Sequence, residues 1–542
     1  MKTMTIALLM ILTGSFLHSV PAAAQEKGAL QEKLGTVTFP VSCSPAASQQ
    51  FERAVAMLHS FWYEEAVKAF TEVTVTDSSC AMGFWGVAMS MYYPLWYAPS
   101  EATLKAGLVA IDRAKAAGAK TQRERDYLSA IEAFYRDWDK SDHRSRTVAY
   151  EKAMERVYTR YPDDREAGIF YALALNATAL PTDKTYANQL KAAAILEKVL
   201  TEQPNHPGVA HYIIHSYDSA PLANRALSAA RSYAKIAPSV PHALHMPGHI
   251  FTRLGLWQES IDSNRMSAEA GAAYSTRTAA DGAWDQTLHS LDYLVYAYLQ
   301  TGRDLAAKRV ADDVGTIRKA YPESLAAAYA LAAIPARVAL ERRRWSEAAA
   351  LSLSPSAFPW NRFPWGEGIT AFARAVGMAR SGDVSGAEKE VAKLETLRDS
   401  LVQVKNKYWA DQVEVQRRAA AALVARAQGK NQEALNGLRS AVDLEGSMDK
   451  HPVTPAPIVP ARELLGELLV ELNQPKDALV EFEGTLMAEP NRFRSLFGAA
   501  QAAELSGDTG KARALYTKVV SLCDRADTER AELKQARAFL SR

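Results

Sequence analysis

The stretch Pro207–His249, PGVAHYIIHSYDSAPLANRALSAARSYAKIAPSVPHALHMPGH, places small residues, prolines and histidines at regular intervals. Ala226 follows Ala192 by 34 residues, and Pro238 follows Pro204 by the same number. A small residue lets two helices pack closely, and a proline ends a helix because it has no N–H for the next hydrogen bond. A constant period of this length indicates helical hairpins that stack on their neighbours.

The same period continues in other parts of the chain. The matching residues are Ala54, Ala66 and Phe70 near the N-terminus, Gly302 and Ala307 in the middle, and Leu465, Gly466, Ala478, Phe482, Pro490, Ala499, Ala500, Ala512 and Tyr516 near the C-terminus. In these residues the chain resembles the tetratricopeptide repeat (TPR) family, as an exported bacterial-type member. The resemblance implies an all-α fold, a TPR-like superhelix of helical hairpins (an α-solenoid), with a concave groove that binds a peptide or protein.

The N-terminus has the pattern of a secretory signal peptide at residues 1–24. Lys2 precedes an apolar run from Met4 to Leu17, and small residues follow up to Ala24. The run is too short to span a bilayer, which needs about 20 apolar residues. We therefore expect an exported protein, periplasmic or secreted, with no membrane insertion.

Charge and cysteine content indicate which classes of partner and which cellular compartment to expect. The chain has 63 Lys and Arg against 61 Asp and Glu, a balance that gives no general attraction to nucleic acid. In an oxidising compartment Cys43 and Cys80 are the expected disulfide pair, because one precedes the first predicted hairpin and the other opens the next. Two free buried thiols are the alternative. Cys523 is expected to stay unpaired.

Proline-rich segments divide the repeats into two predicted arrays. A TPR-like array at 25–353 carries the histidines, the segment PSAFPWNRFPWGEGI at 354–368 forms a joint, and a second TPR-like array occupies 369–542. Proline-rich loops rarely bury two tryptophans without a partner surface. Trp360 and Trp365 are therefore predicted to close over a ligand.

Five of the eleven histidines lie between His211 and His249. His211 and His215 are four residues apart, so they share one face of a helix, with Cβ atoms about 5–6 Å apart. His245 and His249 repeat this spacing one unit later. Neighbouring pairs of this kind can offer three or four imidazoles to one ion. Such a nitrogen-rich set suits zinc or copper.

The TPR resemblance also places these residues in the groove, because positions 2, 5, 9, 12 and 13 of each unit face it in that family. In the unit that starts at Pro207, positions 5, 9 and 12 are His211, His215 and Asp218. In the unit that starts at Pro241, positions 2, 5 and 9 are His242, His245 and His249. In the unit that starts at Leu288, positions 2, 5 and 9 are His289, Asp292 and Tyr296. The six histidines are the predicted metal ligands. Asp218, Asp292 and Tyr296 are predicted to bind the ligand, and either aspartate can also fix a histidine tautomer. Pro247 is expected to end or kink its helix and so to re-aim His249.

Three functions fit this pattern. The first is an exported scaffold that binds a ligand in its groove together with a transition-metal ion held by the histidines. The second is a metal-independent peptide or protein adaptor, and the third is a metal-dependent hydrolase or oxidase. His211 and His215 have the spacing of a zinc-protease helix, but the glutamate that such a helix needs is missing, which excludes a metalloprotease of that kind. No catalytic residue is predicted.

Overall fold

A computed structural model describes residues 32–278 and 281–542. The predicted signal peptide at residues 1–24 lies outside the described residues. Lys33–Arg542 forms one unit by its internal contacts.

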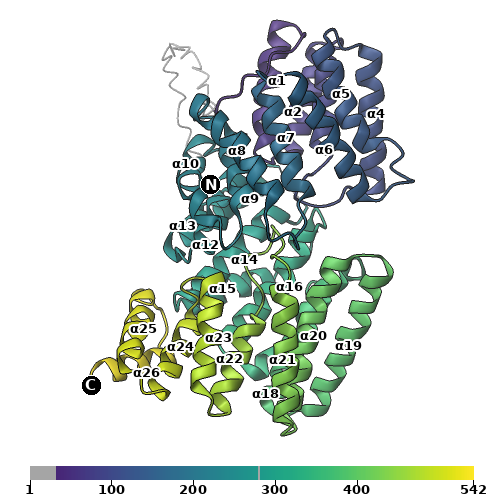
Figure 1. The fold of residues 1–542 in the computed structure, drawn as a ribbon. Coiled ribbons are helices and arrows are strands. Elements are labelled where there is room, and N and C mark those ends of the chain that lie inside the picture. Colours follow the sequence, from purple (N-terminus) through teal and green to yellow (C-terminus); the bar gives the residue numbers. More distant parts are fainter. Residues whose placement is uncertain (1–31, 279–280) are drawn as a thin grey trace, which may run out of the picture. The chain divides into compact units, whose positions relative to one another are not determined.

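Successive helices in the first part of the chain pack as hairpins (Figure 1), and each of the pairs α1 and α2, α3 and α4, α5 and α6, and α7 and α8 is in contact. These helices are α1 (Pro45–His59), α2 (Tyr63–Thr76), α3 (Ala81–Ser90), α4 (Glu101–Ala117), α5 (Gln122–Tyr135), α6 (His143–Arg160), α7 (Arg165–Thr178) and α8 (Ala187–Glu202).

The middle of the chain continues the array and contains one short parallel strand pair, in which Ala283 lies opposite Ala320. Its elements are α9 (Pro207–Tyr217), η1 (Ala223–Ala226), α10 (Leu227–Ile236), α11 (Pro241–His245), α12 (Pro247–Arg253), α13 (Trp257–Arg277), β1 (Ala283–Trp284), α14 (Asp285–Gln300), α15 (Asp304–Gly315), β2 (Ala320–Tyr321), α16 (Leu325–Glu341) and α17 (Trp345–Ala349).

The last part is again a series of paired helices, of which α18 and α19, α20 and α21, α22 and α23, and α24 and α25 contact each other. Its elements are η2 (Trp360–Arg362), α18 (Pro364–Ser381), α19 (Val384–Gln403), α20 (Lys407–Ala427), α21 (Asn431–Gly446), α22 (Ala461–Glu471), α23 (Pro475–Ala488), α24 (Phe493–Leu505), α25 (Thr509–Leu522) and α26 (Ala531–Leu540).

Small residues at the repeat positions allow this close packing. The Phe482 ring on α23 lies so near α22 and α24 that a Cβ on Gly466 would come within 2.9 Å of it, and a Cβ on Gly498 within 2.4 Å. Atoms at 2.4 Å overlap, so the ring requires glycine on α24. The predicted all-α array of TPR-like hairpins is confirmed. The boundaries 25–353, 354–368 and 369–542 stay predictions; the middle segment contains η2 and the first turn of α18.

A disulfide joins Cys43, just before α1, to Cys80, just before α3, with Cα atoms 5.0 Å apart. Cys523 is a buried free thiol. The bond ties the first hairpin to the start of the second. It therefore closes a loop around α1 and α2.

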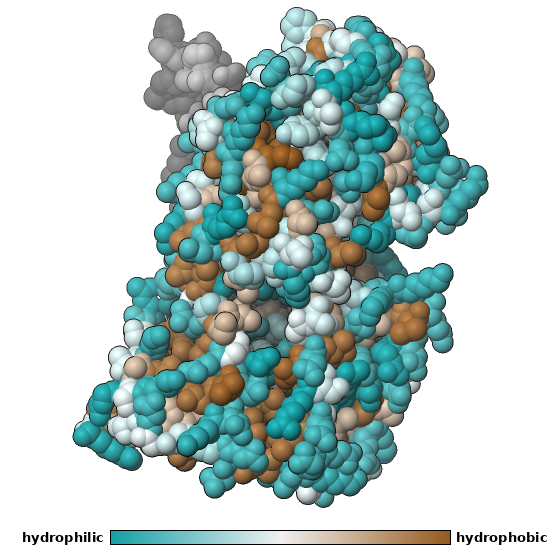
Figure 2. Space-filling view, viewed as in Figure 1, coloured by the Kyte–Doolittle hydropathy of each residue, from teal (hydrophilic) through white to brown (hydrophobic). Residues whose placement is uncertain are grey.

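Figure 2 shows hydrophobic residues on the viewed face as separate patches among hydrophilic ones. In the described part of the chain, no helix combines the length and the apolar character that crossing a bilayer requires.

Candidate metal centre

Four helices in the middle of the chain bring the histidines together. α9 contacts α12, and α14 contacts both α11 and α12, so that Figure 1 shows α9, α12 and α14 side by side. The His215 and His249 ring centroids are 6.1 Å apart, and those of His242 and His245 are 5.9 Å apart. All six histidines predicted as metal ligands lie in this cluster, as two groups of three.

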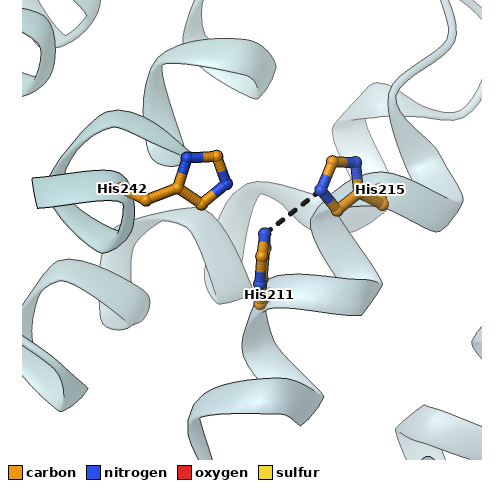
Figure 3. Close-up of side chains that lie close together, drawn as sticks. All are labelled: His211, His215 and His242. Atoms are coloured by element: carbon orange, nitrogen blue, oxygen red, sulfur yellow. Dashed lines mark hydrogen bonds between the residues drawn. The ribbon is translucent and has the colours of Figure 1, made fainter. Parts of the chain in front are cut away.

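The first triad consists of His211 and His215 on α9 and His242 on α11. Figure 3 shows the three rings turned toward one space, with His242 entering from a different helix. The Nε2 atoms of His211 and His215 are 3.1 Å apart. One nitrogen from each ring lies within 4.8 Å of the other two, a spacing that suits one shared ion.

The second triad repeats this arrangement one unit later. His245 on α11, His249 on α12 and His289 on α14 each offer a nitrogen within 4.8 Å of the others. The Nε2 atoms of His245 and His249 are 2.9 Å apart.

Hydrogen bonds fix the tautomers of two rings in the second triad. His245 Nδ1–H donates to Asn264 Oδ1 at 2.6 Å, and His249 Nδ1–H donates to Asp218 Oδ2 at 3.0 Å. The amide orientation of Asn264 follows from its Nδ2, which donates to the Ser260 carbonyl at 2.8 Å. A neutral imidazole has one N–H, so both Nε2 atoms carry lone pairs. Two lone pairs that face each other at 2.9 Å repel each other unless a metal ion or a shared proton lies between them.

The remaining rings also present nitrogen lone pairs or unpaired nitrogens. His211 Nδ1–H donates to the His59 carbonyl at 2.6 Å, which leaves Nε2 as an acceptor. Among the described residues, His242 Nε2 and His289 Nε2 are buried and have no hydrogen-bond partner. A buried nitrogen without a partner is costly, and an ion would satisfy it.

Aromatic side chains enclose the two triads. Phe61 contacts all three rings of the first triad and Tyr293 contacts all three of the second. Trp96 lies edge-on to His242 and to His289, at 5.4 and 5.2 Å between centroids. The TPR resemblance places the histidines in an open groove, but these aromatic residues cover them, so that only His215 keeps partial exposure.

Burial lowers the pKa of every histidine in both triads, and it lowers the pKa of His215 to about 3. Neighbouring imidazoles lower the pKa of five of the rings further, because each disfavours a second positive charge nearby. The pKa of His249 is also lowered by Lys450 and Arg253, whereas Asp218 raises it. The rings are therefore neutral at pH 7, which is the form that binds a metal.

Asp218 joins the second triad to two partly buried cations. Although burial alone would raise the pKa of Asp218, the charges of Lys450 and Arg253 hold it well below its usual range. Lys450 Nζ lies 3.0 Å from Asp218 Oδ2, and Arg253 Nε donates to Asp218 Oδ1 at 2.8 Å. The carboxylate therefore stays ionised while it accepts a hydrogen bond from His249 Nδ1–H. Such an acceptor orients a ligating histidine and increases its basicity.

A cavity of about 320 Å³ begins next to these cations. Lys450 and Arg253 line it, together with Tyr329, Trp365 and Trp409. The rings of Trp365 and Trp409 are stacked with centroids 4.2 Å apart. The cavity has the mixed aromatic and charged lining of a small-ligand site.

The other residues predicted to bind a ligand lie elsewhere. Asp292 pairs with Arg337 at 3.1 Å. The Tyr296 hydroxyl donates to Glu489 at 2.8 Å. Trp360 is buried and its indole N–H donates to the Pro355 carbonyl at 3.0 Å. None of these residues belongs to either triad. Of the two tryptophans predicted to close over a ligand, Trp365 lines the cavity.

A third buried group consists of His59, Glu166 and His206. Both imidazoles contact Glu166 through Nε2 at 2.9 Å. The other nitrogens are also paired, His59 Nδ1 with the Tyr212 hydroxyl and His206 Nδ1 with the Val209 N–H. With every ring nitrogen paired, this group is a structural hydrogen-bond network.

Sequence reasoning missed the residues that enclose and orient the triads. Tyr293 lies four residues after His289, so the helical period alone places both on one face of α14. Asn264, Phe61 and Trp96 give no such signal, because they reach the histidines only through the packing of other helices.

No protein-family model and no curated protein sequence matches the chain. Solved structures of helical-repeat proteins resemble it weakly. The human IFIT1 dimer with PPP-AAAA is 12% identical, with a TM-score of 0.37, over 81% of this chain and 89% of that chain. The APC/C hetero-tetramer Cut9–Hcn1 is 13% identical, with a TM-score of 0.31, over 92% and 90%. Naa15/Naa10 bound to HypK-THB is 14% identical, with a TM-score of 0.23, over 91% and 74%. We draw no argument about function from them.

Proposed function

We propose that this protein is an exported TPR-like scaffold that binds a transition-metal ion, zinc or copper, at its histidine triads. The observation that carries the proposal is the pair of Nε2 lone pairs of His245 and His249, which face each other at 2.9 Å. Both rings have their single proton committed on the opposite nitrogen. A metal ion bound by both nitrogens removes the repulsion between them.

A shared proton is the simplest alternative to a metal ion. It requires one of the two rings to be an imidazolium, and burial opposes that charge in both. It also leaves His289 Nε2 without a partner in the described part of the chain. A metal ion bound by His245, His249 and His289 satisfies all three nitrogens and keeps a position open for a further ligand.

The disulfide and the N-terminal sequence support export. Disulfides are rare in proteins of reducing compartments, and Cys43 and Cys80 form one. Together with the predicted signal peptide at residues 1–24, the bond favours a periplasmic or secreted protein. Cell fractionation tests in which compartment the protein is located. N-terminal sequencing of the mature protein tests whether residues 1–24 are removed.

The metal proposal is tested by metal analysis of mature protein purified without a histidine tag. We expect bound zinc or copper, or uptake of either ion after chelation. The double variant His245→Asn/His249→Asn should lose metal, and His143→Gln, which changes a histidine on α6 outside both triads, should keep it. A wild-type protein that stays metal-free after incubation with zinc and with copper contradicts the proposal.

A metal-independent adaptor is the second candidate, favoured by the cavity that Trp365 and Trp409 line. In that case a peptide or protein partner is bound through the cavity, binding survives chelation, and Trp409→Ala weakens it. Loss of partner binding on chelation, restored by the ion, assigns the function to the metal-bound scaffold instead.

A further inference from the structure

The repeat itself generates the two triads from equivalent positions. Each triad takes its close pair from positions 5 and 9 of one unit and its third histidine from position 2 of the next. The first triad thus consists of His211, His215 and His242, and the second of His245, His249 and His289. Stacked units place equivalent positions in equivalent surroundings, so a site built once by this register is built again one unit later.

We propose that the centre holds two metal ions side by side, one in each triad, each bound by three imidazoles. This inference rests on the proposed function, because it assigns the number and the arrangement of the ions at the same centre. A single ion cannot use all six rings, since the nitrogens that lie within 4.8 Å of one another fall into two separate groups.

The surroundings of the triads are duplicated in the same way. The Phe61 ring contacts the first triad, at 4.4 Å from His211, and the Tyr293 ring contacts the second, at 4.8 Å from His249. Trp96 touches His242 of one triad and His289 of the other. Each triad therefore has an aromatic wall of its own, and one indole is common to both.

The third histidine of each triad is equally unsatisfied. Within residues 32–278 and 281–542, the Nε2 atoms of His242 and His289 both lack a hydrogen-bond partner, and each side chain is 2% exposed. If one ion occupied one triad alone, the other triad would keep a buried nitrogen without a partner. Two ions satisfy both.

The two ions would be neighbours. Rings from different triads approach to 5.9 Å between the centroids of His242 and His245, and to 6.1 Å between those of His215 and His249. Three imidazoles leave each ion with an open coordination position. The triads supply no negative charge, so a small anion such as hydroxide, bound between the ions, would offset part of theirs.

The matched variants His242→Ala and His289→Ala test the pair, because each removes the position-2 histidine from one triad only. After titration with Cu²⁺ and removal of unbound copper, we expect two bound ions per chain in wild type. We expect one bound ion per chain in either variant. His242→Asn and His289→Asn replace the alanine variants where circular dichroism shows a loss of helix.

Electron paramagnetic resonance of the copper-loaded protein tests whether the ions are neighbours. Magnetic interaction between two Cu²⁺ ions is expected in wild type and should be absent in both single variants. One ion for each wild-type chain, or two ions without interaction, overturns the pair but leaves the proposed function intact. Two ions retained in either variant overturn the assignment of that triad. A wild-type chain that takes up no ion overturns both proposals.

Discussion

At the scale of single residues, the partner of each Nδ1 atom decides what the opposite Nε2 atom can do. Asn264 and Asp218 each accept a hydrogen bond from a histidine of the second triad, and the His59 carbonyl does so in the first. These three acceptors are chemically different, yet each directs a lone pair toward the centre of a triad. The ligand set therefore depends on residues that do not themselves bind an ion.

Asp218→Asn is expected to weaken metal binding by about 10- to 100-fold, as loss of such an acceptor does in other metal sites. The amide is uncharged, so it increases the basicity of His249 less than the carboxylate does. Competition with a chelator of known affinity measures the change. Asp292→Asn is the matched control, since Asp292 is a buried acid that pairs with Arg337 outside both triads. Equal weakening in the two variants contradicts this role of Asp218.

The ligands themselves could be predicted from spacing, but their surroundings could not. Histidines four residues apart share a helix face, and the TPR register brings the next unit alongside. The acceptors come from distant segments, such as the His59 carbonyl, which lies 152 residues before His211. Burial also escaped prediction, because Phe61 and Trp96 cover the rings from the turns between α1 and α2 and between α3 and α4.

At the scale of elements, Pro247 interrupts the helix that carries the second pair, as the sequence predicts. α11 ends at His245 and α12 begins at Pro247. Met246, between them, keeps helical backbone angles of φ −54° and ψ −35°. The backbone therefore stays helical at Met246, and His249 Nε2 lies 2.9 Å from His245 Nε2. Pro247 occupies the first turn of α12, where its missing N–H is tolerated. The re-aiming of His249 by this proline stays a prediction.

The disulfide is a second feature at the scale of elements, and its effect on the free energy of unfolding can be measured. It closes a loop of 37 residues in sequence separation. In the chain-entropy view, a loop of this length stabilises the fold by up to about 4 kcal/mol. The double variant Cys43→Ser/Cys80→Ser should lose about 2–4 kcal/mol in the free energy of unfolding, measured with urea.

Reductant provides the control for this prediction. Dithiothreitol should destabilise wild type and should have no effect on the double variant. Cys523→Ser keeps the bond, so it should still respond to reductant. A double variant as stable as oxidised wild type would show that the bond contributes nothing.

Two short strands were not expected from the sequence. β1 and β2 are each two residues long, too short for an alternating pattern to form, and they pair across 35 residues of mostly helical chain. The helices, by contrast, follow from the 34-residue period, because small residues such as Gly498 are required wherever a ring such as Phe482 enters the neighbouring helix.

At the scale of the whole molecule, the buried neutral histidines make the metal-free protein sensitive to acid. Their pKa values are lowered in the folded state, so below about pH 6.5 the unfolded chain binds protons that the folded chain does not. Stability from these groups is complete above that pH and is lost as the pH falls. Each histidine contributes a loss of about 1.4 kcal/mol for each pH unit.

Urea unfolding of the metal-free protein at pH 7.5 and pH 5.5 checks this expectation. The loss of stability between the two values should be smaller in His242→Asn/His289→Asn than in wild type, by about 1.4 kcal/mol for each histidine removed. Equal losses would mean that these two rings titrate alike in the folded and unfolded chains.

The enclosure of the rings by Phe61, Trp96 and Tyr293 also governs exchange kinetics. An occupant of either triad leaves only when helices separate, so its release follows local opening of the fold and is slow compared with free diffusion. Competing ions supplied afterwards would exchange only as fast as this local opening allows. The ion bound to the mature protein would then be the one that was available where the chain first folded.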